Sequence, residues 1–153
     1  MVTLILVLAL QSETSVNAMP IGEKPAPSKI TEREFHRVMD GDAWRKLWAR
    51  HAGRDVEAPA VDFEKFMVVA GLLGPKGGVR RLQVQAGFTD EQMTVRFGPH
   101  VICAGRPEGE EVGFFFARVP RYVKKLVVQQ CEGADGGKLV SPKTEQEFPA
   151  LRK

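Results

Sequence analysis

Residues 82–97, with the sequence LQVQAGFTDEQMTVRF, decide the fold class of this chain. Apolar and polar side chains alternate over residues 82–88 and again over residues 92–97, which is the period of a β-strand with one buried face. A short polar link at residues 89–91 separates the two runs. The stretch therefore predicts a β-hairpin with one face in solvent.

More strands are expected on both sides of this hairpin. The nearly continuous apolar run Phe66–Leu73 ends at a Gly-Pro pair, which is typical of a strand buried on both faces. Residues 114–119 and 126–130 predict two further strands, which Pro120 separates. Residues 35–39 fit a strand as well, but Thr31 and Glu34 have the spacing of a helix capping box, so this stretch stays ambiguous.

One amphipathic helix is expected over residues 41–52. Its inward positions are spaced i, i+3, i+4 and i+7, and they are Trp44, Leu47, Trp48 and His51. Asp40 or Asp42 can cap the N-terminus, and Gly53 ends the helix. Two tryptophans at this spacing indicate core packing rather than a sugar-binding platform. The sum is an α+β, mainly β domain: an antiparallel sheet of about five to six strands with the helix docked on it.

The composition limits the class of protein. The chain has 153 residues, 27% of them charged and 43% hydrophobic, which suits one soluble domain. Two cysteines exclude a disulfide-dense scaffold and a four-cysteine zinc site. A formal net charge of +3 is too small to indicate nucleic-acid binding.

The N-terminus resembles a secretory signal. An apolar run, residues 2–10, is followed by a polar stretch with Val16 and Ala18 in a V-x-A cleavage pattern, so residues 1–18 predict a signal peptide and export. The run is too short for a transmembrane anchor. No Lys or Arg precedes it, and translation from Met19, giving a cytoplasmic protein, is the alternative.

The rest of the chain divides into three parts. Residues 19–29 form a Pro-rich linker that should stay extended, and residues 30–131 form the packed domain. Residues 132–153, rich in Gly and charge, form a flexible tail that could lay residues 148–151 on the domain.

The order of several motifs resembles a known family. Trp44 and Trp48 lie on the expected helix, a Val-Asp-Phe step with Asp62 and Phe63 follows, and Gly77-Gly78 precedes the hairpin, in that order within residues 35–130. This order is similar to that of the C-terminal domain family of the protease-complex accessory subunit PrcB. The resemblance implies a small exported domain without catalytic activity that accompanies another protein, for example a protease. The chain lacks the lipobox cysteine, so surface anchoring does not carry over.

The motif residues also have local structural interpretations. Asp62 can accept backbone N–H bonds at the entry to the strand. Gly77-Gly78 is expected to supply positive φ for a tight turn. An anion-binding loop over residues 74–78 is the alternative, although the P-loop pattern is missing.

The two cysteines are expected to pair if the protein is exported. A Cys103–Cys131 disulfide would close a loop of about 29 residues and stabilise the fold by roughly 3–4 kcal/mol. In the cytosol they would be two reduced thiols. His100 and Cys103 supply only two of the four ligands that a structural zinc needs. The serines all lie outside the packed domain, which argues against a Ser-His-Asp triad. With neither a metal site nor a triad, we expect no catalytic or metal residues, no cofactor and no enzyme activity.

A basic run is the most distinctive surface feature. Arg118, Arg121, Lys124 and Lys125 fall within eight residues. They predict either a surface for an anionic polymer or acidic partner, or simply a charged strand edge that discourages aggregation. Export counts against nucleic acid. The sequence therefore favours an exported, non-enzymatic domain that binds another protein, with anion binding through residues 118–125 as the alternative.

Overall fold

The structure is a computed structural model of the chain. It describes residues 14–17, 19–20, 28–75, 77–80, 82–99, 111–132 and 141–152. In order along the chain, the helix and the strands are β1 (Thr14–Asn17), β2 (Met19–Pro20), β3 (Glu34–Val38), α1 (Gly41–Ala52), β4 (Phe66–Leu72), β5 (Val79–Arg80), β6 (Gln83–Phe88), β7 (Gln92–Gly98), β8 (Glu111–Val112), β9 (Phe114–Pro120), β10 (Lys125–Gln130) and β11 (Lys143–Phe148).

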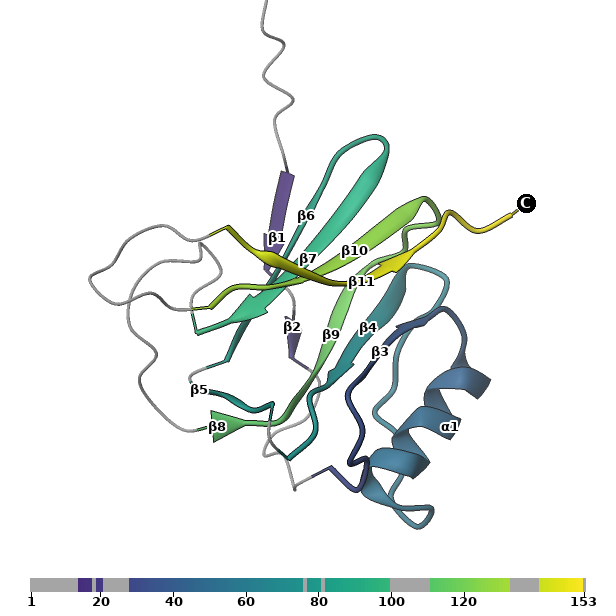
Figure 1. Ribbon diagram of the computed structural model, residues 1–153. Helices are drawn as coiled ribbons and strands as arrows, with labels where there is room; N and C mark the ends of the chain where they lie inside the picture. The colour runs from purple at the N-terminus through teal and green to yellow at the C-terminus, as the bar shows by residue number, and fades with distance from the viewer. Residues whose placement is uncertain are drawn as a thin grey trace, which may run out of the picture.

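The strands form two main sheets and one small ladder (Figure 1). Sheet A has five strands in the order β1-β6-β7-β10-β11, and sheet B has four in the order β2-β9-β4-β3. Strands β5 and β8 pair with each other. The predicted class, α+β and mainly β, is confirmed. The single antiparallel sheet is replaced by two sheets, and β10 runs parallel to β7.

Strand β4 explains why the strands divide in this way. Met67 and Val69 pack in the core between the two sheets, whereas Val68 and Ala70 pack in a second core beneath α1. A sheet with two apolar faces needs a covering layer on each of them. The single helix covers one face of sheet B, so the alternating strands of sheet A cover the other.

Helix α1 begins and ends where the sequence predicts. The side chain of Asp40 accepts a hydrogen bond from the backbone N–H of Ala43 over 2.8 Å and caps the N-terminus. Gly53 ends the helix with φ of 116°, a left-handed conformation that glycine adopts without strain. The ambiguous stretch before the helix is strand β3, so the capping-box interpretation of Thr31 and Glu34 is wrong.

The predicted hairpin is confirmed, with β6 and β7 antiparallel and Phe88 opposite Met93 at the turn. The predicted tail differs more. Within residues 132–153, Lys143–Phe148 forms β11 and pairs with β10, because Phe148 provides an apolar anchor on the core between the sheets. The expectation of a flexible tail is therefore wrong for these residues.

The N-terminal segments also pair with the sheets. Strand β1, inside the predicted signal peptide, pairs with β6, and β2, inside the predicted linker, pairs with β9. In the described part of the chain, we find no helix with the length and hydropathy needed to cross a membrane.

Candidate functional site

A loop and the C-terminal segment come together at one end of the molecule. The backbone N–H of Leu151 donates a hydrogen bond to the carbonyl of Val123 over 2.7 Å. Val123 is 49% exposed and Leu151 is 45% exposed. Among the described residues, Val56 is the only other large hydrophobic residue with comparable exposure. We refer to these two residues as the Val123–Leu151 patch.

Arg37 of β3 fixes the backbone beneath this patch. Its Nη2 donates to the carbonyls of Tyr122 and Lys124, the second over 2.9 Å, and its Nη1 donates to the carbonyl of Pro149 over 3.0 Å. Burial lowers the pKa of Arg37 from its usual value, but a guanidinium stays charged at neutral pH. One half-buried cation therefore holds both segments of the patch in a single arrangement.

Tyr122 ties the same loop to the β6–β7 turn. Its hydroxyl donates to the carbonyl of Thr89 over 2.9 Å. Burial raises the pKa of Tyr122, and the carboxylates of Asp90 and Glu91 raise it further. The phenol is therefore neutral in the folded protein and serves as a hydrogen-bond donor.

The predicted basic run is spread over different neighbours. The guanidinium of Arg118 lies over the ring of Phe66, 4.8 Å from its centroid. The Nζ of Lys125 pairs with the carboxylate of Glu147 at 3.0 Å. Both basic side chains are thus held within the domain.

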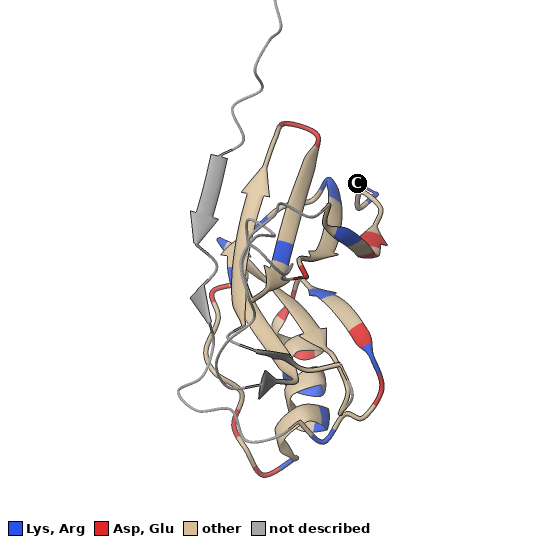
Figure 2. Cartoon of the chain, turned by 60° about the vertical axis from the view of Figure 1, so that its left-hand side comes forward, with Lys and Arg blue, Asp and Glu red and all other residues tan. Residues whose placement is uncertain are grey.

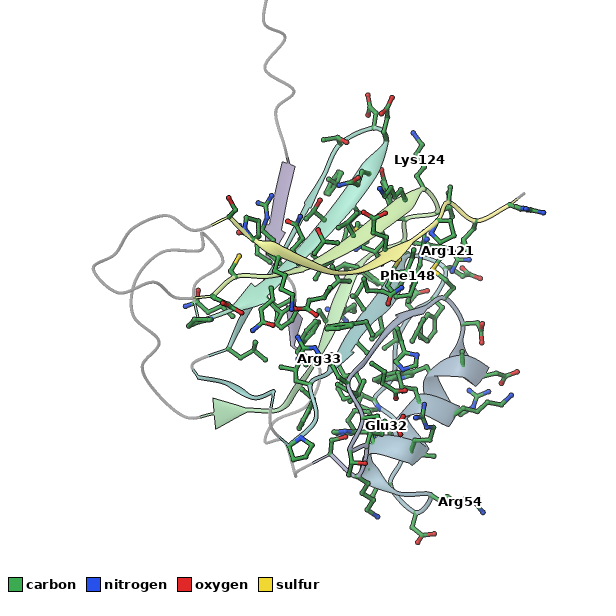
Figure 3. All side chains as sticks on the ribbon, in the orientation of Figure 1. Glu32, Arg33, Arg54, Arg121, Lys124 and Phe148 are labelled. Carbon is green, nitrogen blue, oxygen red and sulfur yellow. The ribbon has the colours of Figure 1, made fainter. Side chains whose placement is uncertain are left out.

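The other two basic residues lie nearer to the patch. Figure 3 shows Arg121 and Lys124 at the end of the molecule that carries the C-terminus. Arg121 donates to the carbonyls of Met39 and Phe63 over 2.8 and 2.6 Å. Lys124 donates to the carbonyl of Asp90 in the β6–β7 turn. The acidic end of this turn is visible in Figure 2, so the charge around the patch is of both signs.

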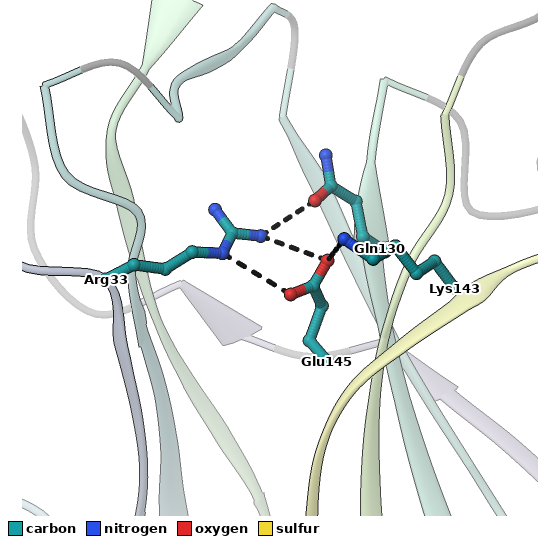
Figure 4. Close-up of polar contacts among 4 residues, drawn as sticks. All are labelled: Arg33, Gln130, Lys143 and Glu145. Carbon is teal, nitrogen blue, oxygen red and sulfur yellow. Dashed lines mark hydrogen bonds and ion pairs between the residues drawn. The ribbon is translucent and has the colours of Figure 1, made fainter.

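A second arginine bridges the sheets farther along the same side (Figure 4). Arg33 pairs with the carboxylate of Glu145 at 3.2 Å and donates to the side-chain carbonyl of Gln130 over 2.8 Å. Lys143 approaches the same carboxylate at 3.3 Å. Glu145 is the extra residue of a β-bulge, since its neighbours Thr144 and Gln146 lie opposite consecutive residues of β10. A bulge of this kind redirects a side chain, here toward Arg33.

The family-motif tryptophans are part of the core beneath α1. Trp44 is buried, and its indole N–H donates to the carbonyl of Pro59 over 2.8 Å. The rings of Trp44 and Trp48 lie 5.2 Å apart, and both pack on Phe116 of β9. The prediction that they pack inward is confirmed.

Asp62 and Phe63 set the entry into β4. The Asp62 carboxylate accepts the N–H of Glu64 over 3.1 Å, and its carbonyl accepts the N–H of Phe66 over 2.9 Å. The predicted local capping by Asp62 is confirmed. Phe63 is half-buried against the core beneath α1.

The glycines after β4 differ from the prediction. Positive φ occurs at Gly74, at 71°, and neither Gly77 nor Gly78 has it. The reason for glycine at Gly77 is close packing, because a Cβ there would lie 2.2 Å from the carbonyl oxygen of Leu73. The prediction of positive φ at Gly77-Gly78 is therefore wrong.

Cys131 directly follows strand β10 and is fully buried. Its thiol is oxidised in a disulfide, and its N–H donates to the carbonyl of Phe97 over 2.8 Å. Cys103 and His100 lie outside the described residues, so the Cys103–Cys131 pairing stays a prediction.

The two described histidines, His36 and His51, have different neighbours. His51 is 4% exposed and packs on the rings of Phe114 and Phe116, and burial lowers its pKa. His36 pairs with Glu34 at 3.2 Å. Across the described residues, no three His, Cys, Asp or Glu side chains gather as a metal site.

Sequence reasoning missed Arg33 and Arg37 as positioning residues. A signal was present, because Arg33, directly before β3, and Phe35 and Arg37, within it, occupy every second position, as residues on one face of an extended chain do. Phe35 packs on Phe97 between the sheets, so the flanking arginines had to turn toward sheet A.

Comparison with known proteins finds no relative of this chain. No protein-family model matches the chain, and neither a curated protein nor a solved structure matches it. The resemblance to the PrcB C-terminal domain family stays a prediction.

Proposed function

We propose that this chain is an exported, non-enzymatic domain that binds another protein through the Val123–Leu151 patch. The observation that carries the proposal is the pair of exposed apolar side chains on a backbone that Arg37 fixes by three hydrogen bonds. A surface that is ordered before binding loses less conformational freedom in the complex.

The rim of the patch indicates the chemistry of the partner. Lys124 and Arg152, the charged residues next to the patch in sequence, are exposed, and Lys124 contacts the β6–β7 turn that carries Asp90 and Glu91. A protein that presents an apolar side chain with charges of both signs beside it would fit this surface, because charge complementarity guides the encounter and apolar contact holds the complex.

The alternative function, binding of an anionic polymer, has less support. A polymer site needs several cations whose fields add over one surface. Here Lys125 pairs with Glu147, and Lys124 contacts the turn that carries Asp90 and Glu91. These carboxylates reduce the positive field of the run.

The PrcB resemblance agrees with an accessory role, and a protease or another envelope protein is the partner that we propose on that basis. The surface of this chain favours contact with a folded protein but does not identify that protein.

Photo-crosslinking in the native source tests the proposal. A crosslinking amino acid replaces Val123 in one full-length variant and the equally exposed Val56 in a matched control. Figure 3 places Arg54, close to Val56 in sequence, at the opposite end of the molecule from Lys124. We expect one discrete crosslinked protein from position 123 and none from position 56. The crosslinked yield should fall at least tenfold in Leu151→Asp and change little at high salt.

Equal crosslinking at both positions would contradict the proposal. A yield that collapses with salt and ignores Leu151→Asp would favour the anionic-polymer alternative.

A further inference from the structure

The N-terminal strands β1 and β2 link the two sheets. They follow each other in the chain with one residue between them, yet β1 pairs with β6 of sheet A and β2 pairs with β9 of sheet B (Figure 1). Thr14 lies opposite Phe88, and Met19 lies opposite Arg118. One short segment thus extends both sheets on the same side of the molecule.

The predicted signal cleavage falls between these strands. A cut after Ala18 removes all of β1 and leaves β2 at the new N-terminus. Residues 85–88 of β6, which pair with β1, then lose their partner on that side. Strand β6 becomes the edge of sheet A, with its N–H and C=O groups open to another strand.

The composition of β6 is unusual for an edge strand. Its sequence, QVQAGF over residues 83–88, contains no charged residue and no proline. Its inner side is anchored, because Ala86 is fully buried and Phe88 packs on the core between the sheets. The other long edge strands differ from it: Arg37 lies in β3, and Lys143, Glu145 and Glu147 lie in β11. Charges at an edge discourage pairing with a foreign strand, and β6 lacks that protection.

Strand β1 indicates what the edge accepts. It is the uncharged sequence TSVN, it contains two β-branched residues, and it pairs antiparallel with four consecutive residues of β6. We propose that in the exported chain the β6 edge is a strand-acceptor site, which binds an extended, uncharged segment of the partner protein antiparallel to β6, in place of β1. Strand addition of this kind takes its affinity from main-chain hydrogen bonds.

This inference rests on the export that is part of the proposed function, and it concerns a surface separate from the Val123–Leu151 patch. A partner that contacts both surfaces would gain from each, since the second contact is intramolecular once the first has formed.

The test uses the protein isolated from its source after export. Its mass decides first: a chain that begins at Met19 agrees with the proposal, and a chain that retains residues 14–17 overturns it. The probe for the cut chain is a synthetic peptide with residues 11–18 of this sequence. A control peptide carries Ser15→Pro and Val16→Pro, since proline lacks the N–H that a ladder needs.

Amide hydrogen exchange at residues 83–88, followed by NMR, reports binding at the edge. We expect the peptide to slow exchange there at least tenfold and the proline control to have no effect. The uncut chain, in which β1 already covers the edge, should not respond. A peptide that leaves exchange in β6 unchanged would overturn the proposal.

Two matched variants of the exported chain locate the effect. Gln85→Lys places a charge on the β6 edge, and Gln146→Lys places the same charge on β11 at the other edge of sheet A. We expect peptide affinity to fall at least tenfold in the first and to stay unchanged in the second, with equal melting temperatures as the check on folding. Equal peptide affinities in the two variants would overturn the proposal that the peptide binds at the β6 edge.

Sedimentation of the cut chain tests whether a second copy of the chain, rather than the partner protein, occupies the β6 edge. A dimer that dissociates in the Gln85→Lys variant would show that the second copy binds there and would overturn the proposed partner. Leu151→Asp should leave peptide binding intact. If the chain that keeps Leu151 forms no crosslinked product at position 123 and yet binds the peptide normally, the proposed function alone is overturned.

Discussion

The guanidinium of Arg33, the residue directly before β3, pairs at 3.2 Å with the carboxylate of Glu145 in β11, across the gap between the two sheets. The Glu145 side chain is only 9% exposed and that of Arg33 is 34% exposed. With Arg37 at the other end of β3, this contact closes the side of the molecule opposite β1 and β2. On this side the side chains of Arg33 and Arg37 connect the two sheets, whereas on the other side the backbone pairing of β1 and β2 connects them.

Glu145→Ala should destabilise the protein by about 1–2 kcal/mol, because Arg33 loses its charged partner in a half-buried position. Urea denaturation measures this change. Asp42→Asn is the matched control, since it breaks the exposed pair with Arg45 and should cost less than about 0.5 kcal/mol. Equal effects would mean that the contact across the gap contributes no more than a surface pair.

Arg37→Lys should loosen the Val123–Leu151 patch while keeping the charge. A lysine has no planar fork to reach carbonyls of both segments at once. We expect the Leu151 amide, which donates to Val123, to exchange at least tenfold faster, and crosslinking at position 123 to fall with it. Amide exchange in β4 serves as the internal reference. Unchanged exchange at Leu151 would show that Arg37 does not position the patch.

His51 should make stability depend on pH in the acidic range. Burial lowers its pKa in the folded protein, so the unfolded chain binds the proton more readily. The stability of neutral His51 is present above about pH 6.5 and is lost as the pH falls from there toward the folded pKa, by up to about 1.4 kcal/mol per pH unit.

His51→Phe should flatten this part of the pH profile, because a phenyl ring fits among Phe114 and Phe116 without a charge. Denaturation at several pH values measures it. A profile that keeps its slope in the variant would assign the dependence to another group.

Reduction should release Cys131 and one further thiol, which we predict to be Cys103. Mass spectrometry after alkylation, with and without prior reduction, counts them. The reduced protein should be less stable by roughly 3–4 kcal/mol if the closed loop has about 29 residues. Alkylation of two thiols in the folded protein without reduction would rule the disulfide out.

Much of the fold could be predicted from local patterns. Helix α1, its cap at Asp40 and its stop at Gly53 follow from short-range chemistry, as do the β6–β7 hairpin and the buried run of β4. The division into two sheets could not be predicted in this way, because it depends on which strands pair across long separations.

The candidate site was harder to predict for the same reason. The patch joins Val123 to Leu151, and Arg37 contacts both segments from a strand far earlier in the chain. The spacing of residues within a short stretch of sequence cannot predict a contact between segments so far apart in the chain. The basic run was visible in sequence, but the neighbours that hold Arg121 and Lys125 were not.

The alternation of β4 between two cores has a consequence for unfolding. Met67 belongs to one core and its neighbour Val68 to the other, so the strand cannot leave either without disturbing both. The helix layer and the outer sheet should therefore melt in one cooperative transition, although they do not share a core. A chain built in this way has no stable half-folded state in which sheet B keeps its helix and sheds sheet A.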